Sequence, residues 1–147
     1  MRGFRLFVFA TLGFATVVAV TAQQRSHRKE HMHQVVFEMT AEAPAQWAAV
    51  LNNVENLKKA FEPERVEVEI VAHGKALGML QKTNTGDAAR MSRLAAAGVR
   101  FAACENTMRR MKVSKSDLYD FAVTVDSGVA EVVRKQEAGW AYIKGGD

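Results

Sequence analysis

Short apolar runs alternate with helical patterns along the chain from Gln34 onward. Runs rich in β-branched and aromatic residues predict strands, and apolar residues that recur every three or four positions predict helices between them. The five expected strands are Val35–Met39, Val66–Val71, Val99–Ala103, Ala122–Val125 and Trp140–Ile143. Strands that alternate with helices are typical of a mainly parallel sheet. The pattern therefore predicts one three-layer α/β/α domain with a five-stranded sheet.

Helix start and stop signals divide the segments between these strands. Pro44 suits the first turn of a helix whose apolar face runs from Trp47 to Phe61. Asp87 is a candidate N-cap for a helix that ends at Gly98. Asp126 or Ser127 is the candidate N-cap of a later helix. Two further helices are expected: one starts at Cys104, and the other follows the capping-box pattern 114–117 and includes Leu118 and Phe121.

The N-terminal segment has the pattern of an export signal. Residues 1–22 carry two arginines before an uncharged apolar stretch, and Val20 and Ala22 supply the small residues of a cleavage site. We expect cleavage after Ala22 and a periplasmic or secreted protein. The alternative is an uncleaved membrane anchor, the only membrane contact we expect. Cleavage would reduce the net charge from +4 to +2, which argues against a nucleic-acid partner.

A polar segment, 23–33, precedes the expected domain 34–147 and holds three of the four histidines: His27, His31 and His33. Imidazoles can ligate a metal, but no acidic cluster or thiol nearby completes a site. We interpret the segment as a solvated linker and expect no metal and no cofactor. Metal binding by these histidines is the alternative.

The carboxyl ends of parallel strands form the ligand-binding edge of such a sheet. The only cysteine of the 147 residues, Cys104, and the only histidine within the domain, His73, both follow strands there. A thiol at the first turn of a helix faces unpaired N–H groups, which favour the reactive thiolate. A buried structural cysteine is the alternative. The neighbouring candidates for binding are Gly74, Glu105, Asn106, Thr107 and Ser127. Trp140 and Tyr142 are expected to pack against the sheet or a second subunit.

Three segments resemble the DsrE/DsrF-like family: GVRFAACENTMRRM at 98–111, VAHG at 71–74, and residues 127–143, which end in GWAYI. The resemblance covers about Gln34 to Lys144 and is closest to exported, single-domain members. It implies a five-stranded parallel sheet and association into homotrimers or homohexamers. In sulfur carriers of the DsrE and TusD type, a cysteine that matches Cys104 holds sulfur as a persulfide.

Two functions follow as hypotheses. The first is a sulfur-relay protein or sulfurtransferase that carries a persulfide on Cys104, with unidentified donor and acceptor proteins and with His73 as a further catalytic residue. This chemistry requires an exposed, partly ionised thiol and an external acceptor, because the chain has no second cysteine. The alternative is a non-catalytic oligomeric module of the same fold that binds a small anion or a partner. It predicts a buried Cys104 that alkylates slowly.

Overall fold

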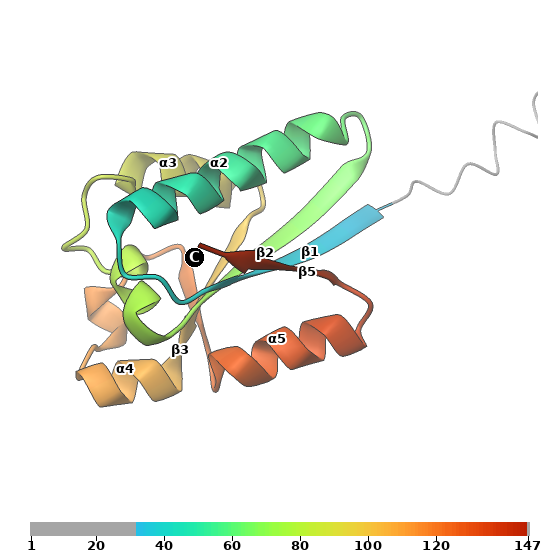
Figure 1. The fold of residues 1–147 in the computed structure, drawn as a ribbon. Coiled ribbons are helices and arrows are strands. Elements are labelled where there is room, and N and C mark those ends of the chain that lie inside the picture. The colour runs from blue at the N-terminus through green and yellow to red at the C-terminus, as the bar shows by residue number, and fades with distance from the viewer. Residues whose placement is uncertain (1–31, 147) are drawn as a thin grey trace, which may run out of the picture. The chain divides into compact units, whose positions relative to one another are not determined.

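The structure is a computed structural model that describes residues 32–146. The expected export signal, its cleavage site, His27 and His31 lie outside the described residues. Five strands alternate with helices and short 3-10 turns (Figure 1). In chain order the elements are β1 Met32–Met39, α2 Pro44–Ala60, β2 Arg65–Ala72, η1 Gly74–Leu80, α3 Ala88–Ala96, β3 Arg100–Cys104, α4 Glu105–Met111, η2 Lys115–Asp117, β4 Ala122–Val125, α5 Gly128–Glu137 and β5 Ala141–Gly145.

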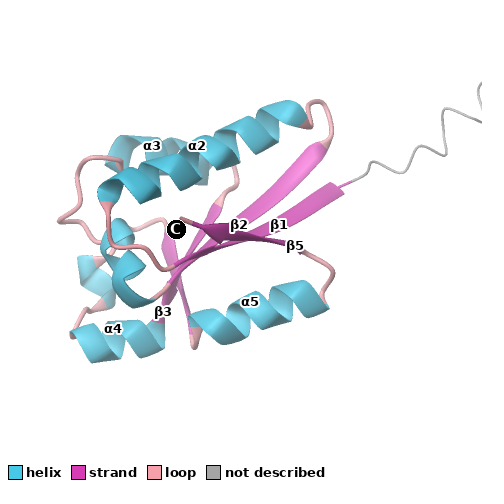
Figure 2. Ribbon diagram, viewed as in Figure 1, coloured by secondary structure: helices cyan, strands magenta, loops and turns pink. Residues whose placement is uncertain are grey.

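All four strand pairings are parallel, and the order across the sheet is β4-β3-β2-β1-β5. The first three crossovers step in one direction, whereas the last returns from β4 to the far side of β1. Since parallel crossovers are right-handed, reversing the direction places the last helix on the opposite face. Accordingly α2 and α3 cover one face and α5 covers the other (Figures 1 and 2). The expected α/β fold is confirmed.

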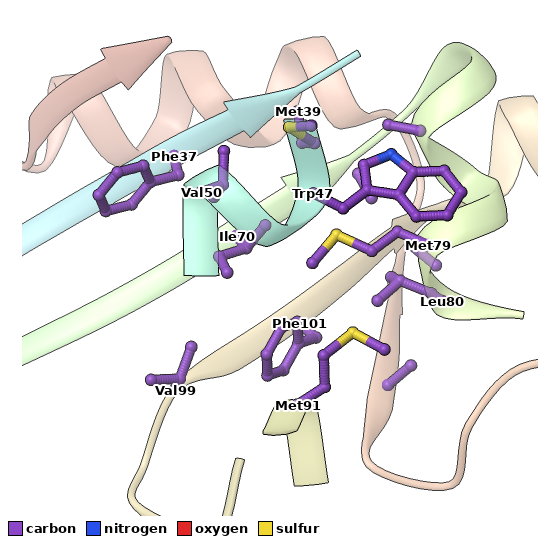
Figure 3. Close-up of a cluster of buried hydrophobic side chains, with 14 of the residues drawn as sticks. Phe37, Met39, Trp47, Val50, Ile70, Met79, Leu80, Met91, Val99 and Phe101 are labelled. Carbon is purple, nitrogen blue, oxygen red and sulfur yellow. The ribbon is translucent and has the colours of Figure 1, made fainter. Parts of the chain in front are cut away.

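The main core fills the face beneath α2 and α3. Phe37, Ile70 and Phe101 of three neighbouring strands meet Trp47 of α2 and Met91 of α3 there (Figure 3). The strand residues are fully buried, and the Trp47 indole N–H donates to the Ala41 carbonyl at 2.8 Å. Burying such side chains contributes roughly 1.5–3 kcal/mol each, so this face is the main source of stability.

A smaller apolar cluster lies on the face beneath α5. Its buried members are Val36, Val71, Ala102, Val125, Val132 and Trp140. Because residues alternate between faces along a strand, the carboxyl-terminal side chains Glu38, His73 and Cys104 belong to this face too. The ends of the sheet beneath α5 are therefore where the chemistry-bearing residues gather.

Two local expectations are wrong. The segment after Ser114 forms its capping box but makes only the short η2 turn. Leu118 instead pairs in an antiparallel bridge with Gln81, and the Tyr119 N–H donates to Leu80, so tertiary pairing overrides the local helix signal. Asp87 precedes α3 as expected but makes no side-chain cap.

Several boundaries also differ from the sequence pattern. Cys104 is the last residue of β3 and the N-cap of α4, rather than a residue within a helix. At the other end of the sheet β1 begins at Met32, so His33 lies in a strand. Its Nε2 is 2.8 Å from Glu64 Oε2, and its ring lies 3.9 Å from that of Phe61.

Candidate functional site

The parallel register brings Cys104 and His73 together. Ala72, the last residue of β2, pairs with Ala103 of β3. His73 directly follows Ala72 in the sequence, and Cys104 directly follows Ala103. Both side chains point to the α5 face, because Ala72 and Ala103 belong to the cluster on the other face. Neighbouring strands lie about 4.8 Å apart, so the two side chains are adjacent. The two candidate catalytic residues thus share one site.

Hydrogen-bond donors converge on the thiol of Cys104. Burial raises the pKa of this thiol, but the Thr107 hydroxyl and the backbone N–H groups of Gly128, Thr107 and Asn106 lower it by more. The net effect is a Cys104 pKa below its ordinary value. The site therefore favours the thiolate, the nucleophilic form.

Thr107 connects the thiol to the turn after β2. Its Oγ1 accepts a hydrogen bond from the Gly74 N–H at 3.0 Å, so its own proton is available for Cys104. Gly74 adopts a φ of 56°, in the left-handed region that favours glycine. Both residues were expected near the site, and their shared hydrogen bond gives each a specific role in it.

The first turn of α5 supplies the donor from the opposite side of the thiol. Ser127 is the N-cap of α5, and its hydroxyl accepts from the Ala130 N–H at 3.4 Å. That cap leaves the Gly128 N–H, at the positive end of the helix dipole, directed to Cys104. Cys104 thus lies near the first turns of both α4 and α5, an arrangement that follows from the pairing of Cys104 with Val125 at the end of β4.

The Cys104 thiol is buried, although the sulfur-relay hypothesis predicts an exposed one. Cys104 is only 4% exposed, whereas the relay hypothesis calls for a thiol presented to solvent. The enclosure has the same origin as the lowered pKa: the N–H groups stabilise the thiolate only because α4 and α5 begin against it. The described structure therefore leaves little of the thiol accessible to a reagent.

Gly128 is required by close packing. A Cβ at this position would lie 2.8 Å from Cβ of His73 and 3.1 Å from its ring carbons Cγ and Cδ2. Atoms do not approach so closely without displacement. Any larger residue must push either His73 or the start of α5 away from the thiol.

We expect Gly128→Ala to destabilise the fold by about 1–3 kcal/mol, as overpacking does elsewhere. It should also raise the pKa of Cys104, because the N–H that stabilises the thiolate moves away. Denaturant unfolding and the pH dependence of alkylation measure the two effects. Gly86→Ala is the matched control, since its nearest heavy atom lies 3.9 Å away. Equal behaviour of the two variants would contradict the packing argument.

His73 belongs to a hydrogen-bonded chain that the sequence pattern did not reveal. Its Nε2 lies 2.8 Å from Glu38 Oε1, and the Tyr142 hydroxyl donates to Glu38 Oε2 at 2.5 Å. Tyr142, expected to serve packing, is 41% exposed and uses its hydroxyl here. The available signal was Glu38 itself, the one charged residue in an otherwise apolar strand end.

The remaining candidates contribute less directly. The Asn106 backbone faces the thiol, while its side-chain oxygen accepts from Arg109. Glu105 Oε2 lies 3.8 Å from Arg109 Nη1, and the Glu105 side chain is half-buried. Within residues 32–146 no cluster of three or more potential metal ligands occurs. Over the same range, no helix has the length and apolar character needed to cross a membrane.

The comparisons with known proteins agree with this architecture. The sequence model of the DsrE/DsrF-like family matches residues 17–144, so the chain belongs to that family. Among solved structures it is similar to a protein of unknown function, MTH1491 from Methanobacterium thermoautotrophicum. The two share 34% identity and a TM-score of 0.72, over 76% of this chain and 98% of the other. No curated protein sequence matches the chain.

Proposed function

We propose that this protein is a sulfur carrier that holds sulfane sulfur as a persulfide on Cys104. Membership of the DsrE/DsrF-like family relates the fold to sulfur relay. The observation that carries the proposal is the set of hydrogen-bond donors that lowers the pKa of the single thiol at the carboxyl end of the sheet. A stabilised thiolate is what attack on sulfur requires.

Sulfur transfer proceeds as thiol exchange in two steps. The Cys104 thiolate attacks the terminal sulfur of a donor persulfide, a bond from Sγ to that sulfur forms, and the donor's S–S bond breaks to release its thiolate. An acceptor thiolate then attacks the same sulfur and regenerates Cys104. The acceptor is external, because Cys104 is the only cysteine in the sequence. We place the exchange outside the cytoplasm, on the basis of the signal-like residues 1–22.

The second candidate function is a non-catalytic module of the same fold that binds a small anion or a partner. The observation in its favour is the 4% exposure of Cys104. It requires no chemistry from the thiol, and it predicts slow alkylation and unchanged behaviour after Cys104→Ala. Thiol reactivity therefore separates the two candidates.

The test is sulfur uptake by the wild-type chain. After exposure to polysulfide and removal of excess reagent, intact mass should increase by about 32 Da, the mass of one sulfur atom. Iodoacetamide should still label the untreated protein at pH values below the pKa of an ordinary thiol, where most such thiols are protonated and react slowly. Absence of both the mass gain and the labelling would favour the non-catalytic module.

We further propose that the chain forms a homotrimer or homohexamer. Val129 and Val133 lie four residues apart on α5 and are 57% and 46% exposed. Apolar residues with this spacing share a helix face, which suits contact with another subunit. Light scattering should give three or six chains per particle, and Val129→Glu/Val133→Glu should reduce that number. A wild-type mass equal to one chain would contradict the proposal.

A further inference from the structure

The chain of Tyr142, Glu38 and His73 uses both oxygens of one carboxylate. Oε1 lies 2.8 Å from His73 Nε2, and Oε2 accepts from the Tyr142 hydroxyl at 2.5 Å. The His73 and Glu38 side chains are 17% and 21% exposed, so water has limited access to the pair. The three residues come from β1, β5 and the end of β2, and only the folded sheet brings them together.

The Glu38 carboxylate determines which ring nitrogen of His73 is protonated. Burial raises the pKa of Glu38, but hydrogen bonds from Tyr142 and His73 and the nearby charge of Lys144 lower it below its ordinary value. An ionised carboxylate accepts only, so Nε2 must be the protonated nitrogen. Nδ1 has no hydrogen-bond partner among the described residues, and it is left to exchange protons.

The imidazole of His73 lies next to the Cys104 thiol. His73 and Cys104 follow the paired residues Ala72 and Ala103, and both lie against Gly128. His73 also continues the ladder to β1, since its N–H donates to the Met39 carbonyl at 3.0 Å. Backbone and side chain together hold the ring in place beside Cys104.

We propose that Glu38 and Tyr142 are positioning residues of the Cys104 site, which hold His73 with Nε2–H toward Glu38 so that Nδ1 exchanges the proton that sulfur transfer requires. This inference rests on the proposed function. Nδ1 takes the proton of the Cys104 thiol through one bridging water, since no direct hydrogen bond joins the two groups among the described residues. The thiolate then attacks the terminal sulfur of a low-molecular-weight persulfide. The bond from Sγ to that sulfur forms, the donor's S–S bond breaks, and the leaving thiolate takes the proton from Nδ1. The products are the Cys104 persulfide and a donor thiol, with no net oxidation.

The experiment combines nitrogen NMR of the imidazole with the kinetics of Cys104. Wild-type His73 should be the Nε2–H tautomer, and Glu38→Gln should give a mixture of tautomers, since an amide can donate as well as accept. Sulfur uptake from glutathione persulfide and alkylation by iodoacetamide should each slow about tenfold in Glu38→Gln. This is less than the roughly 10²–10⁴-fold that acid–base catalysis contributes, because His73 itself remains. Tyr142→Phe, which retains the carboxylate, should keep the Nε2–H tautomer and slow both reactions by less.

Glu67→Gln is the control, because this carboxylate lies on β2 in contact with the exposed amide of Gln34. It should change neither the tautomer nor the rates. A wild-type Nδ1–H tautomer, or unchanged rates in Glu38→Gln, would overturn the inference. If the wild type takes up no sulfur while Glu38→Gln still slows alkylation, the proposed function fails and the positioning role stands. Tautomer and alkylation thus distinguish the two failures.

Discussion

Cys104→Ser should take up no sulfane sulfur under conditions in which the wild-type chain gains one sulfur atom. Serine occupies nearly the same space, and its hydroxyl can accept from the same Gly128 and Thr107 groups that stabilise the thiolate. We therefore expect a stability change of only about 1 kcal/mol, the range of one altered hydrogen bond. The loss should be complete, because the chain has no other cysteine. Intact mass after exposure to polysulfide, with unfolding curves for both proteins, measures the two effects.

A relocated thiol provides the matched control. Cys104→Ser/Ser116→Cys carries one exposed thiol on the η2 turn, away from both helix starts. Labelling rates follow the thiolate fraction, so each falls as the pH decreases below the pKa of its thiol. Because the site lowers the pKa of Cys104, the wild-type rate should fall at a lower pH than the rate of the control. Coincident pH profiles, or a sulfur adduct on Cys104→Ser, would contradict the assignment.

Lys135→Met should destabilise the fold by about 3–5 kcal/mol at neutral pH, the usual cost of removing one partner of a buried ion pair. Glu69 on β2 is fully buried, and its Oε2 lies 2.8 Å from Lys135 Nζ and 3.4 Å from Arg100 Nε. The Lys135 ammonium also lies 3.9 Å from the centre of the Trp140 ring. Methionine retains the packing of the side chain but leaves the Glu69 carboxylate with Arg100 as its remaining cationic partner, at 3.4 Å.

The pH dependence of this loss identifies its cause. Burial raises the pKa of Glu69, and Lys135 opposes that rise, so the pKa should increase further in Lys135→Met. A raised carboxyl pKa means that the unfolded chain ionises first. Stability therefore falls as the pH increases from the ordinary glutamate range through the folded-state pKa, and it is constant above it. The destabilisation should be smaller at pH 5 than at pH 8 in denaturant unfolding.

Two further variants serve as controls for the buried pair. Lys135→Met/Glu69→Gln should recover most of the lost stability, because no buried charge then lacks its partner. Lys82→Met removes an exposed pair with Asp120, 3.0 Å long, and should cost no more than about 1 kcal/mol. If Lys135→Met costs no more than Lys82→Met, Glu69 does not depend on Lys135.

The strands and helices of the domain were predictable because their signals are local. The apolar faces of α2 and α3 and the apolar run of β3 each follow from residues within one segment. The same applies to the sheet edge, since Cys104 and His73 follow strands that must be parallel. Where a local signal failed, at the segment after Ser114, a pairing with the distant residue Gln81 replaced it.

The sequence pattern could not separate residues that look alike locally. Glu67 and Glu69 lie on the same face of β2, yet Glu67 is exposed and Glu69 is fully buried. Only Glu69 lies beneath α5, within reach of Lys135, and no property of the strand alone indicates that. Tyr142 likewise reads as an ordinary packing residue until β5 places it beside β1.

Taken alone, the sequence determined the fold class, the family resemblance and the two residues at the sheet edge, because the periodicity of apolar residues and the alternation of strands with helices are local properties of the chain. Tertiary structure alone decided the state of the thiol and its surroundings. Glu38 lies 35 residues from His73 and 104 residues from Tyr142, and Gly128 lies 24 residues from Cys104. Their contacts depend on strand register and on the face that α5 covers, which form only when the whole sheet assembles.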